Sequence, residues 1–163
     1  FEPIERMDVI CNYTFTNFKY SSYRSQVFDS SGNFVEVDLS DTRVPAVPQH
    51  LVNFIIEGEP EIVKHLEGLI IFDCDYASRM FVDDQNTEST SPYFLTNFMA
   101  GINYTNKNFS FILSAGIKNI LDRRYVGFIN INANPEFPVG MRRYYEPGEP
   151  RNFYLSMNIN YKF

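Results

Sequence analysis

The chain has 163 residues, 44% of them hydrophobic, and its 14 basic and 20 acidic side chains leave a net charge of −6. Nucleic-acid binding is not expected, because no run of basic residues appears, and no apolar run is long enough for a helix to cross a membrane. The length suits one domain or a piece of a larger protein. A transmembrane β-barrel is not excluded, because its strands alternate apolar and polar residues and so contain no long apolar run.

Aromatic content and a period of two predict strands throughout the chain. The sequence holds 16 Phe and 11 Tyr but no Trp, and aromatic residues favour strands. Near the end of the chain, Leu155, Met157 and Ile159 alternate with polar residues, which predicts a strand with one apolar face. In chain order the six predicted strands lie within residues 6–16, 49–56, 62–82 (alternating over 66–77), 93–104, 109–120 and 152–163.

Long and short connections alternate between these strands. Long polar segments at 17–48, 83–92 and 121–150 follow the first, third and fifth strands, and "SSGN" within the first of them suggests a local hairpin. Short turns, "EGEP" at 57–60 and "TNKN" at 105–108, follow the second and fourth strands. Outer-membrane barrels alternate long outer loops with short periplasmic turns. The predicted fold is therefore all-β, an antiparallel up-and-down meander of about six strands that forms a segment of a transmembrane β-barrel.

The alternative is a soluble β-sandwich, a free-standing binding module that is secreted or periplasmic, since such a fold also shows alternation and many aromatic residues. Two features favour the barrel: aromatic residues lie near strand ends, as in interfacial girdles, and polar residues gather on the opposite face, as in a water-facing lumen. The aromatic set is Tyr13, Phe15, Tyr93, Phe94, Tyr104, Phe153, Tyr161 and Phe163, and the polar set is Asp8, Asn12, Glu67, Asp73, Asp75, Asn158 and Asn160.

Four phrases resemble, in the same order, the C-terminal barrel part of TonB-dependent outer-membrane receptors. They are "DTRVPAVPQHLVNF" at 41–54, "DYASRMFVDDQNTESTSPYFLTNFMAGINY" at 75–104, "GIKNILDRRYVGF" at 116–128 and "RRYYEPGEPRNFYLSMNINYKF" at 142–163. The third departs from the family's Asn-Leu-Phe-Asp phrase at Ile120 and Leu121. Each phrase alone is weak, but four in order are specific. The resemblance covers residues 1–163 and implies one C-terminal barrel segment, without the plug domain and the TonB-contacting segment.

The resemblance implies uptake rather than catalysis. Such receptors bind a scarce nutrient outside the cell, usually a ferric siderophore, haem, cobalamin or a glycan, and import it with energy relayed by TonB. The implied location is the bacterial outer membrane, with no cofactor. The implied partners are outer-membrane lipid, the rest of the barrel and its plug, TonB, and the barrel assembly machinery. Receptor barrels close with about 22 strands, so six strands can form only part of the wall.

The end of the chain resembles the assembly signal of outer-membrane barrels. Apolar residues stand at every second position back from a terminal Phe, with a Tyr two residues before it. Such a strand presents an apolar face to lipid and an edge that can pair with the folding machinery. The expected signal residues are Leu155, Met157, Ile159, Tyr161 and Phe163. An ordinary edge strand that ends in Phe is the alternative.

Ligand-binding candidates lie in the long loops. Guanidinium groups bind carboxylates or anionic chelates, and the flanking rings stack on planar groups. The candidates are Arg142, Arg143, Tyr144 and Tyr145 from the third loop, and Tyr23 and Arg24 from the first. The alternative, which we favour at this point, is an interfacial Arg/Tyr belt that meets anionic headgroups.

Other polar groups give little sign of a metal site or an enzyme. No Ser-His-Asp or Cys-His grouping appears, and Asp73 and Asp75 suit a hydrated lumen wall better than acid–base catalysis. Cys11 and Cys74 lack neighbouring metal ligands and read as two small unpaired hydrophobic residues. An oxygen cluster that could bind a cation, or simply shape turns, comprises Asp83, Asp84, Asn86 and Asp122.

Overall fold

The computed structural model describes residues 6–29, 31–132 and 145–163. Within these residues the chain forms eleven strands, and no helix there is long and apolar enough to cross a membrane. In chain order the strands are β1 (Met7–Phe15), β2 (Arg24–Phe28), β3 (Phe34–Asp38), β4 (His50–Gly58), β5 (Glu61–Val63), β6 (Leu66–Ala77), β7 (Tyr93–Thr105), β8 (Phe109–Lys118), β9 (Val126–Ile129), β10 (Tyr145–Pro147) and β11 (Asn152–Tyr161).

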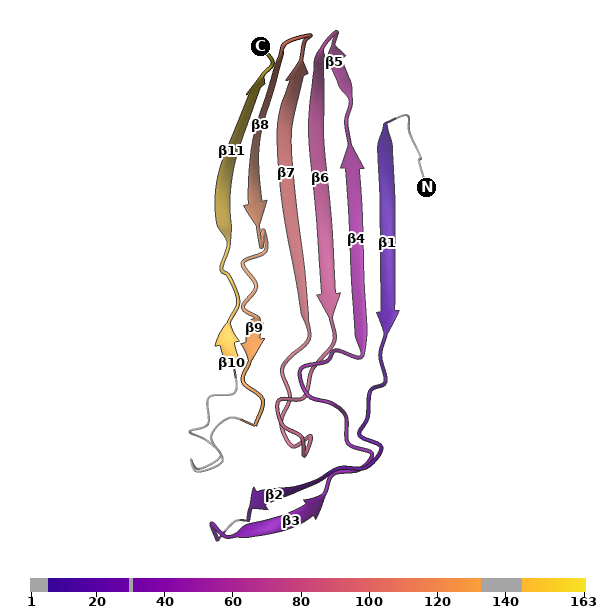
Figure 1. The fold of residues 1–163 in the computed structure, drawn as a ribbon, viewed down its shortest axis with the longest axis vertical. Helices are drawn as coiled ribbons and strands as arrows, with labels where there is room; N and C mark the ends of the chain where they lie inside the picture. The colour runs from indigo at the N-terminus through magenta and orange to yellow at the C-terminus, as the bar shows by residue number, and fades with distance from the viewer. Residues whose placement is uncertain (1–5, 30, 133–144) are drawn as a thin grey trace.

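The six long strands form one antiparallel sheet in which each strand lies beside the next long strand along the chain. The order is β1-β4-β6-β7-β8-β11, with the short β5 also paired to β6. Figure 1 shows the short connections at one end of the sheet and the long ones at the other, with the start of β1 and the end of β11 toward the short-connection end. The predicted antiparallel up-and-down meander is confirmed, and the described sheet is open between its two edge strands.

The first short turn lies elsewhere than expected. The prediction that "EGEP" reverses the chain is wrong, because β5 continues in the direction of β4 and still pairs with β6. The reversal comes at Lys64 and His65, where His65 takes a positive φ of 73°. Pro60 cannot donate to the ladder, but its carbonyl accepts a hydrogen bond from Gly68 N at 2.8 Å. Glu59 and Pro60 therefore interrupt a strand instead of ending it.

Two of the long loops contain small ribbons. The hairpin expected around "SSGN" is β2–β3, and its turn is closed by Asp29, whose carboxylate accepts hydrogen bonds from Ser31 N and Asn33 N at 2.8 Å. The hydrogen bond from Asn33 is also the main reason that the pKa of Asp29 is lowered. The ribbon β9–β10 in the third loop was not expected from the sequence.

One face of the long sheet is almost entirely apolar. Paired residues lie on the same face, so the registers carry the alternation from strand to strand. Aromatic rings mark both margins of this apolar face: Tyr13, Phe15, Tyr76, Phe94 and Phe153 at the loop end, and Tyr104, Phe109 and Tyr161 at the turn end. The residues between them include Val9, Phe54, Ile56, Ile70, Phe72, Phe98, Ile102, Phe111, Leu113, Leu155, Met157 and Ile159.

The core does not lie under the sheet. Among the described residues the buried hydrophobic side chains are Leu39, Ala77, Met80 and Val82, which sit in the loops or where the sheet meets them. By contrast, Leu155 on the apolar face is 73% exposed. The long strands of the described residues form a single layer, and no second sheet packs on their apolar face. This arrangement does not support a soluble β-sandwich, which buries that face between two sheets.

Candidate functional site

A buried carboxylate joins the three long loops at one end of the sheet. Asp84, in the second loop, is 8% exposed. Its Oδ1 accepts a hydrogen bond from Tyr20 Oη at 2.7 Å, and its Oδ2 accepts bonds from Tyr23 Oη at 3.4 Å and Asn132 Nδ2 at 2.6 Å. Tyr20 and Tyr23 belong to the first loop and Asn132 to the third. Asp84 therefore holds parts of all three loops together.

Backbone contacts support this junction. Asp84 N donates to Asn132 Oδ1 at 2.9 Å, and Asn132 N donates to Val82 O at 3.1 Å. Val82 is fully buried and contacts Ile129. Burial, together with the hydrogen bond to Asp84 and its negative charge, raises the pKa of Tyr20 to about 12. Tyr20 therefore stays a neutral hydrogen-bond donor over the physiological pH range.

The oxygen cluster expected from the sequence is divided between separate structural roles. Asp83 accepts hydrogen bonds from Thr87 N, Thr87 Oγ1 and Glu88 N within its own loop. Asn86 bonds the backbone of Arg43 in both directions, at 2.7 and 2.8 Å. No group of three His, Cys, Asp or Glu side chains in the described part of the chain is placed to hold a metal ion. The turn chemistry offered as the alternative accounts for Asp83.

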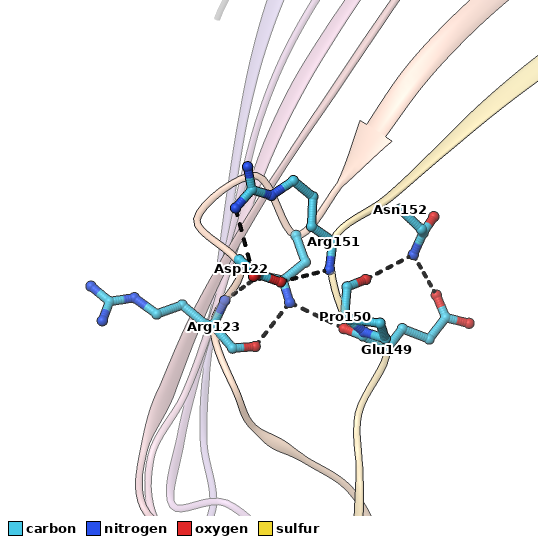
Figure 2. A network of polar contacts seen from close by, with 7 residues as sticks. Asp122, Arg123, Glu149, Pro150, Arg151 and Asn152 are labelled. Atoms are coloured by element: carbon cyan, nitrogen blue, oxygen red, sulfur yellow. Dashed lines mark hydrogen bonds and ion pairs between the residues drawn. The ribbon is translucent and has the colours of Figure 1, made fainter.

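The base of the third loop is closed by a second polar network (Figure 2). Asn119 is 3% exposed, and its Nδ2 donates to Arg123 O at 2.9 Å and to Glu149 O at 3.1 Å. Arg123 N in turn donates to Asn119 Oδ1. Figure 2 shows Arg151 against Asp122, with Arg151 N donating to Asp122 Oδ1 at 3.0 Å and the two side chains forming an ion pair at 3.6 Å. The third and fourth sequence phrases thus meet in space.

The polar face of the sheet carries two hydrogen-bonded rows. In one, Asn12 Nδ2 donates to Asn53 Oδ1 at 3.3 Å and Asn53 Nδ2 donates to Asp75 Oδ1 at 2.9 Å. In the other, Asn97 Nδ2 donates to Asp73 Oδ1 at 2.7 Å. These rows run across neighbouring strands at mid-height, so Asp73 and Asp75 serve as acceptors in a polar wall. This is the use that the sequence favoured over acid–base catalysis.

A cavity of about 440 Å³ lies on the loop side of the sheet, between the end of the second loop and the β9–β10 ribbon. Residues 89–92 form one wall, and Tyr93, Tyr125 and Tyr145 contribute rings. The rings of Tyr93 and Tyr125 are tilted against each other with centroids 5.0 Å apart. Tyr93 starts β7 on the polar face, opposite Ala77, and so faces away from the apolar side.

The predicted ligand-binding residues do not form one group in the described structure. Tyr23 points to Asp84, and Arg24 lies 3.6 Å from Glu36 across the β2–β3 hairpin, with both side chains exposed. Tyr145 lines the cavity and is 53% exposed. Arg142, Arg143 and Tyr144 lie outside the described residues.

The predicted assembly-signal residues share the apolar face of the edge strand. Leu155, Met157, Ile159 and Tyr161 pair with Ala115, Leu113, Phe111 and Phe109 of β8 and are 55–73% exposed. The ring of Phe163 contacts the ring of Tyr161 with centroids 5.2 Å apart. The expected apolar face is present, and the role of these residues in assembly stays a prediction.

Sequence reasoning missed the two residues that organise the loops, Asp84 and Asn119. The sequence suggests Asp84 only as a possible cation ligand, because its partner Asn132 is 48 residues away. Asn119 is buried with a φ of 51°, a conformation that Asn tolerates better than most residues. The signal for Asn119 was its place near the end of the predicted strand 109–120, just before a polar segment and within a phrase of the resemblance.

Two solved structures share this fold. One is BauA, the ferric preacinetobactin receptor from Acinetobacter baumannii, with a TM-score of 0.70 and 17% identity over 99% of this chain and 20% of that receptor. The other is the siderophore receptor PiuA from Acinetobacter baumannii, with a TM-score of 0.67 and 20% identity over 99% of this chain and 20% of that receptor. No protein-family model matches the sequence.

The chain spans about a fifth of the length of both receptors. At these identities the likeness establishes the fold. The predicted resemblance to TonB-dependent outer-membrane receptors is thereby confirmed at the level of the fold: the chain shares the fold of the matched fifth of each receptor.

Proposed function

We propose that this chain is part of the barrel wall of a bacterial outer-membrane receptor that binds a ferric siderophore and imports it with energy supplied through TonB. The observation that carries the proposal is the uncovered apolar face of the long sheet with aromatic rings at both margins. In water, exposed aliphatic side chains such as Leu155 would lose the free energy of burial, about 25 cal/mol for each Å². Lipid restores that burial without a second protein layer.

The dimensions of the apolar face support a membrane location. From Phe94 to Tyr104, the two margins of the apolar face on β7, the strand covers about 33 Å. At the roughly 40° strand tilt of outer-membrane barrels this corresponds to a depth of about 25 Å, the height of their apolar band. The polar rows at mid-height then face a hydrated interior, where Asn53 and Asp75 need no apolar cover.

Further parts of the proposal concern what surrounds the chain. The two open edges, β1 and β11, would pair with the rest of the barrel, since an unpaired strand edge is not stable in lipid. The polar face would meet a plug, and TonB would act through a part of the receptor that this sequence does not include. Recognition of Leu155, Met157, Ile159, Tyr161 and Phe163 by the assembly machinery, and a place at the C-terminal end of the barrel, stay predictions.

The choice of a ferric siderophore over haem, cobalamin or a glycan is supported by the two solved structures, both of which are siderophore receptors. The loop cluster at one end of the sheet is where a ligand would first meet the protein. We propose no catalytic step, since binding and passage require no bond to be made or broken in the ligand.

Iron uptake by cells that carry the intact protein tests this proposal. Cells would be offered a panel of catecholate, hydroxamate and mixed-ligand siderophores loaded with ⁵⁵Fe, with and without the gene and with and without TonB. The expected result is uptake of at least one ferric siderophore that requires both the gene and TonB, with the protein in the outer-membrane fraction. Recovery of the protein in a soluble fraction, or uptake unchanged by loss of the gene, would contradict it.

A further inference from the structure

The cavity between the second loop and the β9–β10 ribbon has the features of a ligand site. Its volume of about 440 Å³ falls within the range of small-molecule sites, about 300–1,000 Å³. Its walls are the rings of Tyr93, Tyr125 and Tyr145, the prolines at 92 and 147, and the polar residues 89–91. Aromatic walls with a few polar groups are typical of pockets that bind small organic molecules.

The aromatic wall is held in place by backbone contacts. The ring of Tyr125 lies directly over Gly148, in space that any side chain larger than hydrogen would occupy. Gly148 N also donates to Tyr125 O at 2.8 Å, which fixes the ribbon against the ring. The base of the same loop is closed by the Asn119 network. These contacts fix the Tyr125 side of the cavity.

The polar groups of the cavity select for an anionic aromatic group. Among the residues that the structure describes, Arg124 is the one charged residue that lines it. Glu146, between Tyr145 and Pro147 in β10, is not among the lining residues. Tyr93, Tyr125 and Tyr145 add phenol groups to the same lining. An arginine and three tyrosines in one lining suit a planar ring that carries a carboxylate or phenolate oxygen.

We infer that this cavity binds an aryl group with an anionic oxygen, through ring contacts with Tyr125 and Tyr145 and a charge-assisted hydrogen bond from Arg124. That such an aryl group is part of an imported siderophore rests on the proposed function, whereas binding of the aryl group to the cavity does not.

Salicylate is the probe for the test. Two comparison compounds each lack one of its features: cyclohexanecarboxylate has no aromatic ring, and benzyl alcohol has no negative charge. Binding to the intact protein in detergent micelles is measured by equilibrium dialysis. The variants are Arg124→Gln and Tyr145→Leu. Arg123→Gln is the matched control, because Arg123 is the exposed sequence neighbour of Arg124 and does not line the cavity. Its side chain reaches away from the polar network at the base of the third loop (Figure 2).

Salicylate should bind saturably and at least tenfold more tightly than either comparison compound. Arg124→Gln and Tyr145→Leu should each raise its Kd at least tenfold, and Arg123→Gln should leave it unchanged. Absence of saturable salicylate binding, or an equal loss in Arg123→Gln, would overturn the inference. Iron uptake by the same variants separates the two proposals: salicylate binding without iron uptake refutes the transport function alone, and iron uptake without salicylate binding refutes the cavity alone.

Discussion

Replacing Asp84 with alanine should release the three outer loops from one another. The substitution removes the carboxylate that accepts hydrogen bonds from Tyr20 and Tyr23 in the first loop and from Asn132 in the third. The strands of the sheet do not depend on these bonds, because their ladders are formed by backbone groups. The expected effect is therefore local opening at the loop end, with the sheet intact.

The two short hydrogen bonds set the magnitude. Bonds to a charged group contribute about 1.5–3 kcal/mol each, so the bonds from Tyr20 at 2.7 Å and Asn132 at 2.6 Å together amount to roughly 3–6 kcal/mol. The cost of burying the carboxylate offsets part of this. A net loss of about 2–4 kcal/mol corresponds to a loop-opening equilibrium that shifts by roughly 30-fold to 1,000-fold.

Hydrogen–deuterium exchange of the intact protein measures this opening. Asp84→Ala should speed exchange around Tyr20 in the first loop and around Asn132 in the third. Asp83→Ala is the matched control, since the Asp83 carboxylate bonds only Thr87 and Glu88 in its own loop and should affect only the second loop. If Asp84→Ala changes exchange in the second loop alone, or if Asp83→Ala opens all three loops, the reasoning is refuted.

Three further predictions follow from other contacts. Because the pKa of Tyr20 is raised from 10.0 to about 12, its contribution to loop stability is full below pH 10 and is lost as the pH rises from 10 to 12. The phenolate difference spectrum between wild type and Tyr20→Phe should show a midpoint near 12. A midpoint near 10 would contradict the burial of this hydroxyl. Asn119→Ala removes three hydrogen bonds at about 1 kcal/mol each and should make the third loop more susceptible to limited proteolysis, with unchanged cleavage as the contrary result. Gly148→Ala places a Cβ in the ring of Tyr125 and should lower the stability measured by thermal unfolding by about 1–3 kcal/mol. At Gly58 there is space for a Cβ, so Gly58→Ala should be nearly neutral. Equal effects of the two substitutions would refute the argument.

The long strands were predictable because each shows the period of two over enough residues. The alternation expected over 66–77, within the predicted stretch 62–82, coincides with β6, and the strand expected at 93–104 differs from β7 by a single residue. The misplaced turn at 57–60 has the Gly and Pro that normally mark a reversal. There the chain continues because β6 extends beyond Gly58 and offers partners to Glu61 and Val63.

The loop cluster was not predictable in the same way. β9 has four residues and its partner lies about twenty residues further along, so neither segment carries a periodic signal of its own. Asp83 and Asp84 look alike in sequence, yet one closes a local turn and the other joins three loops. The direction of each carboxylate is set by contacts that are distant in the chain, such as the one between Asp84 and Asn132.

The central claim, that the apolar face of the sheet contacts lipid, is tested most directly by labelling neighbouring positions of β11 in the intact protein. Met157→Cys and Asn158→Cys, each in a background with Cys11→Ser and Cys74→Ser, would carry a bimane fluorophore in vesicles with and without brominated lipid. Met157 lies on the apolar face and Asn158 on the polar face. The account predicts strong quenching by brominated lipid at position 157 and little at 158. Equal quenching at both positions, or stronger quenching at 158, would contradict it.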